Sequence, residues 1–240
     1  MRYDPLTVGQ FSKEIAKESS IGADRLVYME KDVWLSYLLK SIYEIENATT
    51  ELVFKGGTSL VKCYYPHYRF SEDLDFTWIG ERQSKKVNRR NFKLKYVDKL
   101  ASVLGLGFEE TADIPRGVRH SQSGKVLNYF FTLPTSEPGA IPLKVKINVS
   151  FGETLAFPVN KISVKPFAIS AEKTKELTGI FGEVAKDYFG EFLIPVYSKE
   201  EIADIFSENF EIASIIESVY QGTLTQNPKA LFGVLVRREA

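Results

Sequence analysis

Alternating hydrophobic and polar residues predict strands through the middle of the chain. Between positions 144 and 151 every second residue is apolar, and Lys, Asn or Ser occupies the positions between. Successive side chains of a strand point to opposite faces of a sheet, so this pattern predicts a strand with one buried and one polar face. Residues 126–133 show the same alternation, and the runs 52–54 and 161–167 predict two further strands.

Apolar residues at helical spacing predict two helices near the N-terminus. In residues 7–20, Phe11 and Ile15 lie one turn apart, which indicates a short amphipathic helix. Residues 23–46 carry a much wider apolar face, which predicts a helix buried on more than one side. The residues that form this face are Val33, Trp34, Leu35, Tyr37, Leu38, Leu39, Ile42 and Ile45.

The C-terminal part is also predicted to be helical. Ser198, followed three residues later by Glu201, forms a capping box, which is typical of a helix N-terminus. The apolar residues that continue the helical pattern are Ile212, Ile215, Ile216 and Val219. We therefore expect an α+β protein with N-terminal helices (1–48), a mixed-sheet core (49–195) and a partial C-terminal helical lobe (196–240) that is shortened or truncated.

The densest chemical signal follows the predicted strand 52–54. Two glycines, Gly56 and Gly57, precede a hydroxyl pair, Thr58 and Ser59, at the start of a predicted short helix. Glycine reaches backbone conformations that are closed to residues with a Cβ, so backbone amides here can approach a phosphate closely. A helix N-terminus also presents unpaired N–H groups, which favour an anion.

Two aspartates follow on another predicted strand. Asp73 and Asp75 are two positions apart and therefore share one face, with Leu74 and Phe76 on the other. Carboxylates this close raise each other's pKa, and a hard divalent cation that prefers oxygen ligands removes the conflict. Either motif alone has an ordinary explanation, a turn for the glycines and a solvated strand face for the aspartates. Together they predict a metal and phosphate site.

The order of these elements, a strand, GG-Thr-Ser, a helix and a strand with two aspartates, resembles the nucleotidyltransferase superfamily related to DNA polymerase beta. More closely, it resembles the AbiEii/AbiGii toxin branch, whose core reads KGG(T/S)xL followed by RxSxDxDF. The matching residues are Lys55, Gly56, Gly57, Thr58, Leu60, Arg69, Ser71, Asp73, Asp75 and Phe76. Residues 28–32 also resemble the (V/L)EKD segment of that family, although an ordinary charge cluster within a helix explains them as well.

The resemblance implies a metal-dependent enzyme that transfers a nucleotidyl group from an NTP to an acceptor, in a type IV toxin–antitoxin or abortive-infection setting. Asp73 and Asp75 would hold Mg²⁺ or Mn²⁺, and Lys146 would neutralise charge on the phosphates. The residues expected to hold the nucleotide are Gly56, Gly57, Thr58, Ser59, Arg69 and Ser71. Arg69 has a second explanation, an ion pair that holds the turn before the aspartates.

One position departs from the pattern of that family. The predicted strand 144–151 would lie beside the aspartate strand and carry a third carboxylate, but Asn148 stands at that position. An amide is a neutral, weaker metal ligand, and it cannot act as a base at pH 7. The alternative is therefore a catalytically impaired member of the fold that only binds nucleotide or RNA. Glu153 follows closely and could substitute for the missing charge, but strand geometry does not place it on the face of Asn148.

Charge composition decides where an RNA acceptor could bind. The chain carries 31 basic and 31 acidic residues, so nucleic-acid binding requires a local patch. Residues 82–99 hold eight cations and one acidic residue, Asp98, and are the best candidate contact for an RNA or tRNA acceptor. A charged helix face that is simply solvated is the other explanation.

Two further expectations come from the single cysteine and from the absence of a long apolar run, and a third comes from the resemblance. Cys63 is the only cysteine, which excludes an intramolecular disulfide and favours a small buried side chain. Nowhere do about 18 uninterrupted apolar residues occur, so we expect a cytoplasmic protein with no membrane partner. A cognate antitoxin is the protein partner that the resemblance implies.

Overall fold

The computed structural model describes residues 2–64, 70, 73–80, 90–110, 126–136, 142–151, 153, 159–167, 169–196, 211–221 and 228–237. Within these residues, a seven-stranded mixed sheet has the order β3-β4-β5-β2-β1-β7-β6. The strands, in that order, are Gly107–Glu110, Val126–Leu133, Leu143–Phe151, Asp73–Trp78, Leu52–Lys55, Leu193–Val196 and Asn160–Ser163. Strand β2 runs parallel to β5, and β1 runs parallel to β7, whereas the other neighbours are antiparallel. The predicted α+β class with a mixed sheet is confirmed.

The strand predicted over residues 161–167 is shorter than expected. Strand β6 ends at Ser163, after which the backbone N–H of Val164 bonds the carbonyl of Phe192. The next N–H, from Lys165, bonds the carbonyl of Lys62 at 2.7 Å. The bond of Val164 still follows the β6–β7 register, and the chain leaves the sheet at Lys165, whose N–H finds its partner at Lys62.

Strand β5 shows why the alternation predicted its orientation correctly. Val145, Ile147 and Val149 are buried, whereas Lys146 and Asn148 are partly exposed. On β2, Leu74 and Phe76 are likewise buried on the apolar face. The opposite side is called the polar face below. It consists of Asp73, Asp75, Thr77, Lys146, Asn148 and Ser150.

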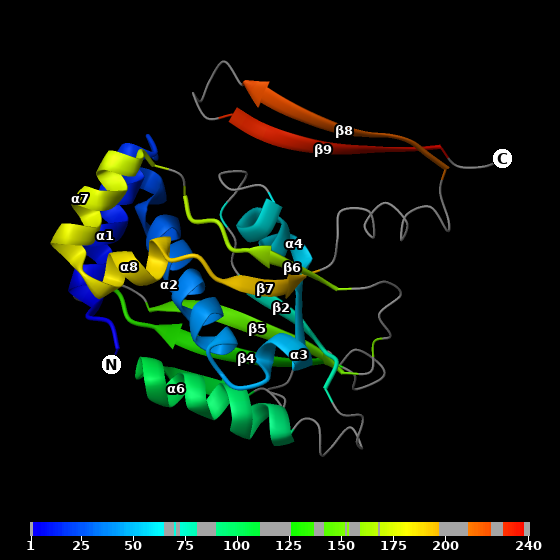
Figure 1. Ribbon diagram of the computed structural model, residues 1–240, viewed down its shortest axis with the longest axis horizontal. Coiled ribbons are helices and arrows are strands. Elements are labelled where there is room, and N and C mark those ends of the chain that lie inside the picture. The colour runs from blue at the N-terminus through cyan, green and yellow to red at the C-terminus, as the bar shows by residue number, and fades with distance from the viewer. Residues whose placement is uncertain are drawn as a thin grey trace.

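Helices account for much of the rest of the described chain (Figure 1). The α-helices are α1 (Pro5–Glu18), α2 (Leu26–Tyr43), α3 (Ala48–Glu51), α4 (Gly56–Ser59), α6 (Asp98–Leu104), α7 (Ala171–Phe181) and α8 (Glu183–Phe189), and the other helical turns are η1 (Ala23–Arg25), η2 (Leu60–Tyr64) and η3 (Lys93–Val97). Helix α1 begins where the Asp4 carboxylate accepts a hydrogen bond from the N–H of Thr7 at 2.8 Å. The two N-terminal helices are confirmed.

Helix α2 is the central helix of the core. It lies between the group formed by α1, α7 and α8 and the sheet (Figure 1), and most of its residues are buried. The ring of Tyr3 stacks on Tyr37 with centroids 4.1 Å apart, and Trp34 meets Tyr37 edge to face. Burying each such side chain stabilises the fold by on the order of 2 kcal/mol. The broad apolar face of this helix therefore predicted burial on several sides correctly.

The helical segment that ends at Leu104 covers the apolar face of the sheet. Phe92 and Tyr96 pack against Trp78, and Phe92 also contacts Tyr129 and Phe151. Gly105 ends this segment with a φ of 64°, a left-handed conformation that favours glycine. The apolar stripe predicted along this basic segment is confirmed in the described residues.

The predicted C-terminal helix is wrong over residues 211–237. Strands β8 (Glu211–Gln221) and β9 (Pro228–Arg237) pair as an antiparallel hairpin, with Ile215 opposite Val234. The same isoleucines and valines that recur at helical spacing are β-branched, which favours strands. The predicted capping box at residues 198–201 lies outside the described residues. No described helix is long and apolar enough to cross a membrane.

Candidate functional site

The glycine turn packs directly against one of the two aspartates. Gly56 follows β1 with a φ of 76°, and a Cβ at this position would lie 2.4 Å from Oδ2 of Asp75. Only glycine satisfies both the conformation and the close approach. The hydroxyl of Thr58 donates to the carbonyl of Asp73 at 2.6 Å, and that of Ser59 donates to the carbonyl of Gly56 at 2.8 Å. The two hydroxyls thus hold the turn, and the turn holds the aspartate strand.

The sheet register brings the candidate residues together. Asp75 on β2 is opposite Lys55 on β1 and opposite Asn148 on β5. Asp73 is opposite Lys146, and its Oδ2 lies 2.9 Å from the lysine Nζ. The structure thus places residues 73, 75, 146 and 148 on one face of the sheet.

The environment of Asp75 opposes its negative charge. Burial, and next the nearby Asp73, raise the pKa of Asp75, while Lys146 and Lys55 lower it in part. A carboxylate whose charge is poorly balanced gains from a bound cation. A metal ion bound here would therefore offset the negative charge of Asp75.

The third carboxylate of the pattern is replaced by an amide that is held in place. Nδ2 of Asn148 donates to Oδ1 of Asn128 on β4 at 2.9 Å. The amide oxygen of Asn148, Oδ1, takes no part in this hydrogen bond, and the residue is opposite Asp75 in the β2–β5 register. Within the described residues, no group of three or more His, Cys, Asp or Glu side chains could hold a metal ion by itself.

Two carboxylates and an amide oxygen still fit Mg²⁺ or Mn²⁺. Magnesium keeps several waters and is commonly bound through one or two carboxylates plus substrate phosphates, not by a complete protein cage. Asp73 and Asp75 supply the two carboxylates from one face, and Asn148 can supply a neutral oxygen. The donor set therefore suits a metal that arrives with a nucleotide.

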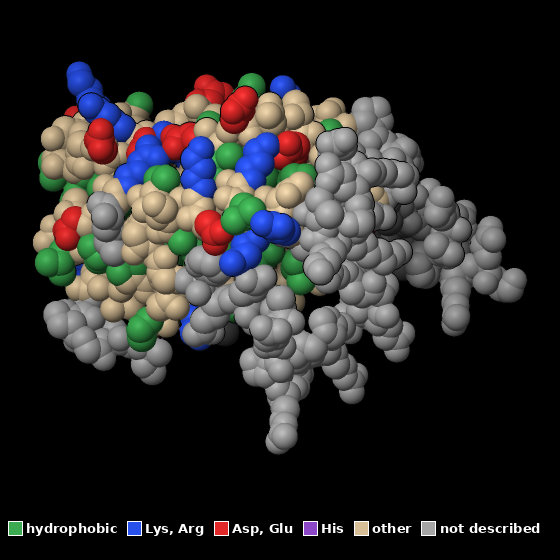
Figure 2. Space-filling model, turned by 90° about the horizontal axis from the view of Figure 1, so that it is seen from below, with side chains coloured by type: hydrophobic (Ala, Val, Ile, Leu, Met, Phe, Trp, Pro, Cys, Tyr) green, Lys and Arg blue, Asp and Glu red, His purple; other side chains and the backbone are tan. Residues whose placement is uncertain are grey.

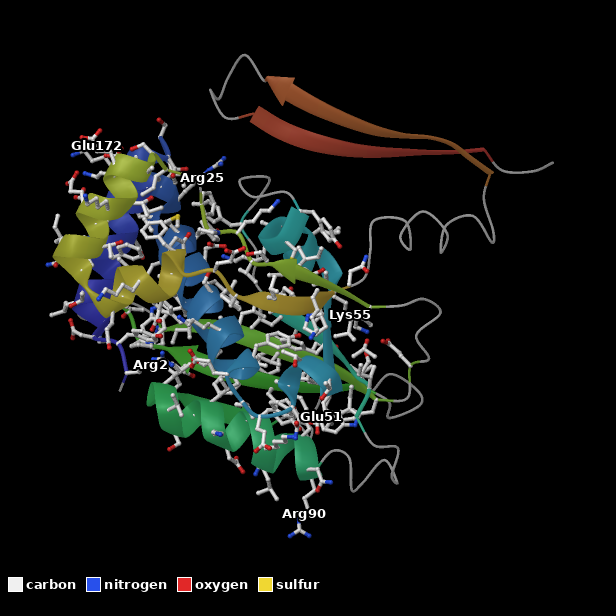
Figure 3. All side chains as sticks on the ribbon, in the orientation of Figure 1. Arg2, Arg25, Glu51, Lys55, Arg90 and Glu172 are labelled. Carbon is white, nitrogen blue, oxygen red and sulfur yellow. The ribbon has the colours of Figure 1, made fainter. Side chains whose placement is uncertain are left out.

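A second group of charges, unforeseen from the sequence, lies at the other end of the polar face. Nζ of Lys55 is 2.6 Å from Oε2 of Glu153 and 3.0 Å from Oγ of Ser150, and Thr77 donates to the same carboxylate. Burial alone would raise the pKa of Glu153, but the hydrogen bonds from Lys55 and Thr77 lower it. Lys55 is at the end of β1 (Figure 3).

The prediction that Glu153 lies off this face is wrong. Strand β5 ends at Phe151, so the alternation of side chains no longer applies two residues later. The Glu153 carboxylate reaches Thr77, which shares the face of Asp75. Glu153 is near enough to contribute to the raised pKa of Asp75. Lys55 and Glu153 were both named from the sequence, but no local pattern indicated that they would pair with each other and with Thr77.

Several predicted site residues lie outside the described residues. These are Arg69, Ser71, Arg82, Lys85, Lys86 and Arg89. Of the described cations in the basic run, Lys95 forms a 2.8 Å ion pair with Glu51, which also accepts from Tyr96. On the face shown in Figure 2, Lys and Arg side chains are interspersed with Asp and Glu. The predicted RNA contact stays a prediction.

The (V/L)EKD-like segment contacts two different parts of the core. Glu30 accepts hydrogen bonds from the backbone and the hydroxyl of Ser136, at 3.0 and 2.8 Å. Asp32 forms a buried ion pair with Lys62, which lies just after the glycine turn. The segment is therefore packed near the site and is more than a solvated charge cluster.

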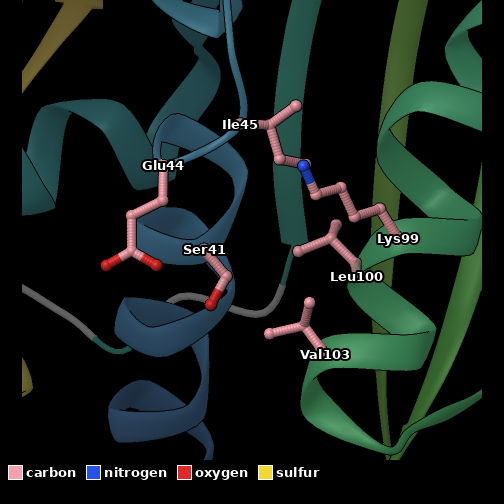
Figure 4. Close-up of a pocket in the computed structure, with 6 residues that line it drawn as sticks. All are labelled: Ser41, Glu44, Ile45, Lys99, Leu100 and Val103. Atoms are coloured by element: carbon pink, nitrogen blue, oxygen red, sulfur yellow. The ribbon is translucent and has the colours of Figure 1, made fainter.

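A small cavity lies away from the aspartates. It has a volume of about 180 Å³ and lies between α2 and α6 (Figure 4). Its lining residues are Ser41, Glu44, Ile45, Lys99, Leu100 and Val103. Because α6 belongs to the segment that covers the apolar face, the sheet separates this cavity from the polar face.

A family model described as "Nucleotidyl transferase AbiEii toxin, Type IV TA system" matches residues 37–204. No curated protein matches the chain. Among solved structures, the chain is similar to a candidate nucleotidyltransferase from H. pylori, with 17% identity and a TM-score of 0.38. That match covers 77% of this chain and 58% of the other, so the chain spans less than two thirds of that protein.

The family match includes every described residue of the site. It begins within α2, contains the glycine turn and both aspartates, and extends beyond β7. It covers more than half of the chain. The chain belongs to the AbiEii family of nucleotidyl transferase toxins of type IV toxin–antitoxin systems.

Proposed function

We propose that this protein transfers a nucleotidyl group from an NTP to an acceptor in a metal-dependent reaction. One observation carries the proposal. Asp73 and Asp75 share the polar face of β2, and the Gly56 turn lies against Asp75 so closely that no side chain fits between them. A carboxylate pair beside a glycine turn is what a metal–triphosphate substrate requires.

The roles of the residues follow from their positions. Asp73 and Asp75 would hold the metal, which when bound supplies positive charge to the phosphates and the leaving group. Lys146, already 2.9 Å from Asp73, would contact a phosphate oxygen of a nucleotide bound there. Backbone amides of the turn that begins at Gly56 would face the phosphates. Asn148 would orient the metal as a neutral ligand but would take no proton from the acceptor.

The acceptor that we propose is RNA, with tRNA as the first candidate, and the setting is a toxin inhibited by a cognate antitoxin. The family description supports the toxin assignment. Arg90 supports an RNA contact because it is exposed at the start of the described basic segment and points away from the protein (Figure 3). The eight cations of residues 82–99 are the second observation that supports an RNA contact.

The test is transfer of label from each of the four α-³²P NTPs to total tRNA with Mg²⁺. We expect label with the parent chain and a loss of at least about a thousandfold with Asp73→Asn/Asp75→Asn, because the metal ligands are gone. Asp24→Asn is the matched control, since Asp24 is 82% exposed. Label that persists in the double variant would contradict the proposal.

A second candidate function is nucleotide or RNA binding without turnover. Asn148 favours it, because its amide is opposite Asp75 where the family pattern has a carboxylate. Asn148→Asp separates the two candidates. An inert parent that gains activity in this variant supports the binding function, whereas an active parent excludes it.

A further inference from the structure

A buried ion pair lies directly behind the glycine turn. Nζ of Lys62 is 2.6 Å from Oδ2 of Asp32, 3.3 Å from the Asp32 carbonyl and 2.8 Å from Oγ of Ser36. Asp32 and Ser36 are one turn apart on α2. The Lys62 and Asp32 side chains are 3% and 0% exposed. Three acceptors thus match the three hydrogens of the ammonium group.

Lys62 is fixed from both sides. Its backbone carbonyl accepts the N–H of Lys165, while its side chain reaches α2. It sits in the middle of η2, a π-helical turn that follows α4 without a break. Such turns are uncommon and occur frequently at functional sites. The backbone from Gly56 onward is therefore tied to the rest of the protein at a defined point.

The other end of the same segment is tied to the aspartate strand. The hydroxyl of Thr58 donates to the carbonyl of Asp73, so a displacement of α4 relative to β2 would break this hydrogen bond. Between Thr58 and Lys62 there are only three residues. The turn is thus held between β2 on one side and α2 on the other.

Stability alone is a poor explanation for this pair. Burying two charges is expensive, and well-packed apolar residues of similar size are often as stable or more stable. Oδ1 of Asp32 is also buried and has no hydrogen-bond partner among the described residues. What the ion pair adds over an apolar pair is a fixed position for the backbone that carries it.

We propose that Asp32 and Lys62 are positioning residues that hold the Gly56 turn in register with Asp73 and Asp75 for nucleotide binding. The nucleotide-binding part of this inference rests on the proposed function. The part that concerns the turn does not, since it describes how α2 fixes the backbone around Thr58. The two parts can be measured separately.

Hydrogen exchange tests the turn itself. In Asp32→Leu/Lys62→Met, an apolar pair replaces the ions and the fold is retained, but we expect exchange at the amides of residues 57–63 to quicken at least tenfold. Lys40→Met/Asp187→Leu is the matched control, because it removes an ion pair between α2 and α8. The control should leave exchange at residues 57–63 unchanged. Unchanged exchange in the Asp32/Lys62 variant would overturn the inference, whatever the protein's activity.

Nucleotide affinity tests the consequence. We expect the Asp32→Leu/Lys62→Met variant to bind a non-hydrolysable NTP analogue at least tenfold more weakly than the parent, with KM rising more than kcat falls. Faster exchange together with parental affinity would overturn the positioning role. A parent that binds no nucleotide would overturn the proposed function, while the exchange result would still decide whether Asp32 and Lys62 fix the turn. The single variant Lys62→Arg keeps the positive charge. It should bind the analogue more tightly than Asp32→Leu/Lys62→Met does.

Discussion

The carboxylates at the two ends of the polar face have pKa values that are shifted in opposite directions. At one end, burial and the neighbouring Asp73 raise the pKa of Asp75, and two lysines only partly offset this. At the other end, the carboxylate of Glu153 is bonded by Lys55 and Thr77, and its pKa is lowered despite burial. The two carboxylates lie on the same face of one sheet, so burial alone does not explain the difference.

The difference lies in what each carboxylate is bonded to. Glu153 has both oxygens within 2.7 Å of one ammonium group, so its charge is balanced within the protein. Asp75 forms no ion pair with any of the described residues. The backbone of Gly56 lies close to its carboxylate. The balanced end is an ion pair within the protein, and the unbalanced end is the one that a metal would complete.

Asn148→Asp should have the largest effect of the variants considered, by raising the affinity of the unbalanced end for a divalent cation. The new carboxylate is opposite Asp75 in the β2–β5 register and adds a charged oxygen where the chain has an amide. Because affinity for divalent cations rises with the number of charged ligands, Mn²⁺ binding should tighten by about tenfold or more, roughly 1.4 kcal/mol. Titration of Mn²⁺ followed by electron paramagnetic resonance measures this.

The same variant should also change the pH dependence of metal binding. A third negative group raises the pKa of Asp75 further, and protonated carboxylates bind metal poorly, so affinity should begin to fall at a higher pH on acidification. Asn160→Asp, on an exposed position of β6, is the control and should leave both results unchanged. Unchanged Mn²⁺ affinity in Asn148→Asp would show that position 148 does not reach the metal.

Lys55→Met should weaken the balanced end by about 1 kcal/mol. The variant leaves the Glu153 carboxylate with hydroxyl donors only, but that side chain is 42% exposed, so solvent screens part of the loss. The pKa of Glu153 is lowered in the folded state, so its stabilising effect is present at neutral pH and is lost as pH falls through that lowered pKa. The stability difference between variant and parent should therefore shrink in acid.

Urea unfolding at several pH values measures this effect. Lys161→Met removes an exposed lysine from β6 and should change the midpoint little. Adding Glu153→Gln to Lys55→Met should recover part of the stability, because no unpaired carboxylate is then left. A loss that is equal at neutral and acidic pH would contradict the ion-pair explanation.

Much of the site could be predicted because its signals are local. The alternation along residues 144–151 and the spacing of Asp73 and Asp75 specify faces directly, and the glycines mark a turn with little ambiguity. Alternation fixes the face of Asn148 but not its neighbouring strand, so its place beside the aspartate strand was implied by the family resemblance, and the structure sets it opposite Asp75.

The missed features depend on partners far away in the sequence. Residues 211–221 satisfy helical spacing, but their partner strand at 228–237 decides the outcome. Glu153 follows the end of a strand, where alternation no longer predicts direction. Asp32 could pair with any of 31 basic residues, and only the packing of α2 against η2 selects Lys62.

Asp75→Asn should give the smallest change in stability. It tests directly whether the charge of Asp75 is poorly balanced in the folded protein. The pKa of Asp75 is raised in the folded protein, so the folded state binds the proton more tightly than the unfolded chain and loses stability as pH rises through this range. Replacing the carboxylate by an amide removes that loss at neutral pH. Because the group is partly exposed, we expect a gain below about 1 kcal/mol, or at most a few degrees in Tm.

Thermal unfolding of Asp75→Asn and Asp73→Asn between pH 4 and pH 8 distinguishes the two aspartates. Asp73 forms an ion pair with Lys146, so its removal should give no gain. The gain in Asp75→Asn should grow from acidic to neutral pH, while transfer activity is lost. A residue that weakens the fold when ionised and is needed for activity is expected at a site shaped for a ligand. If Asp75→Asn is instead less stable than the parent at neutral pH, the charge of Asp75 is balanced within the protein, and the two ends of the polar face do not differ.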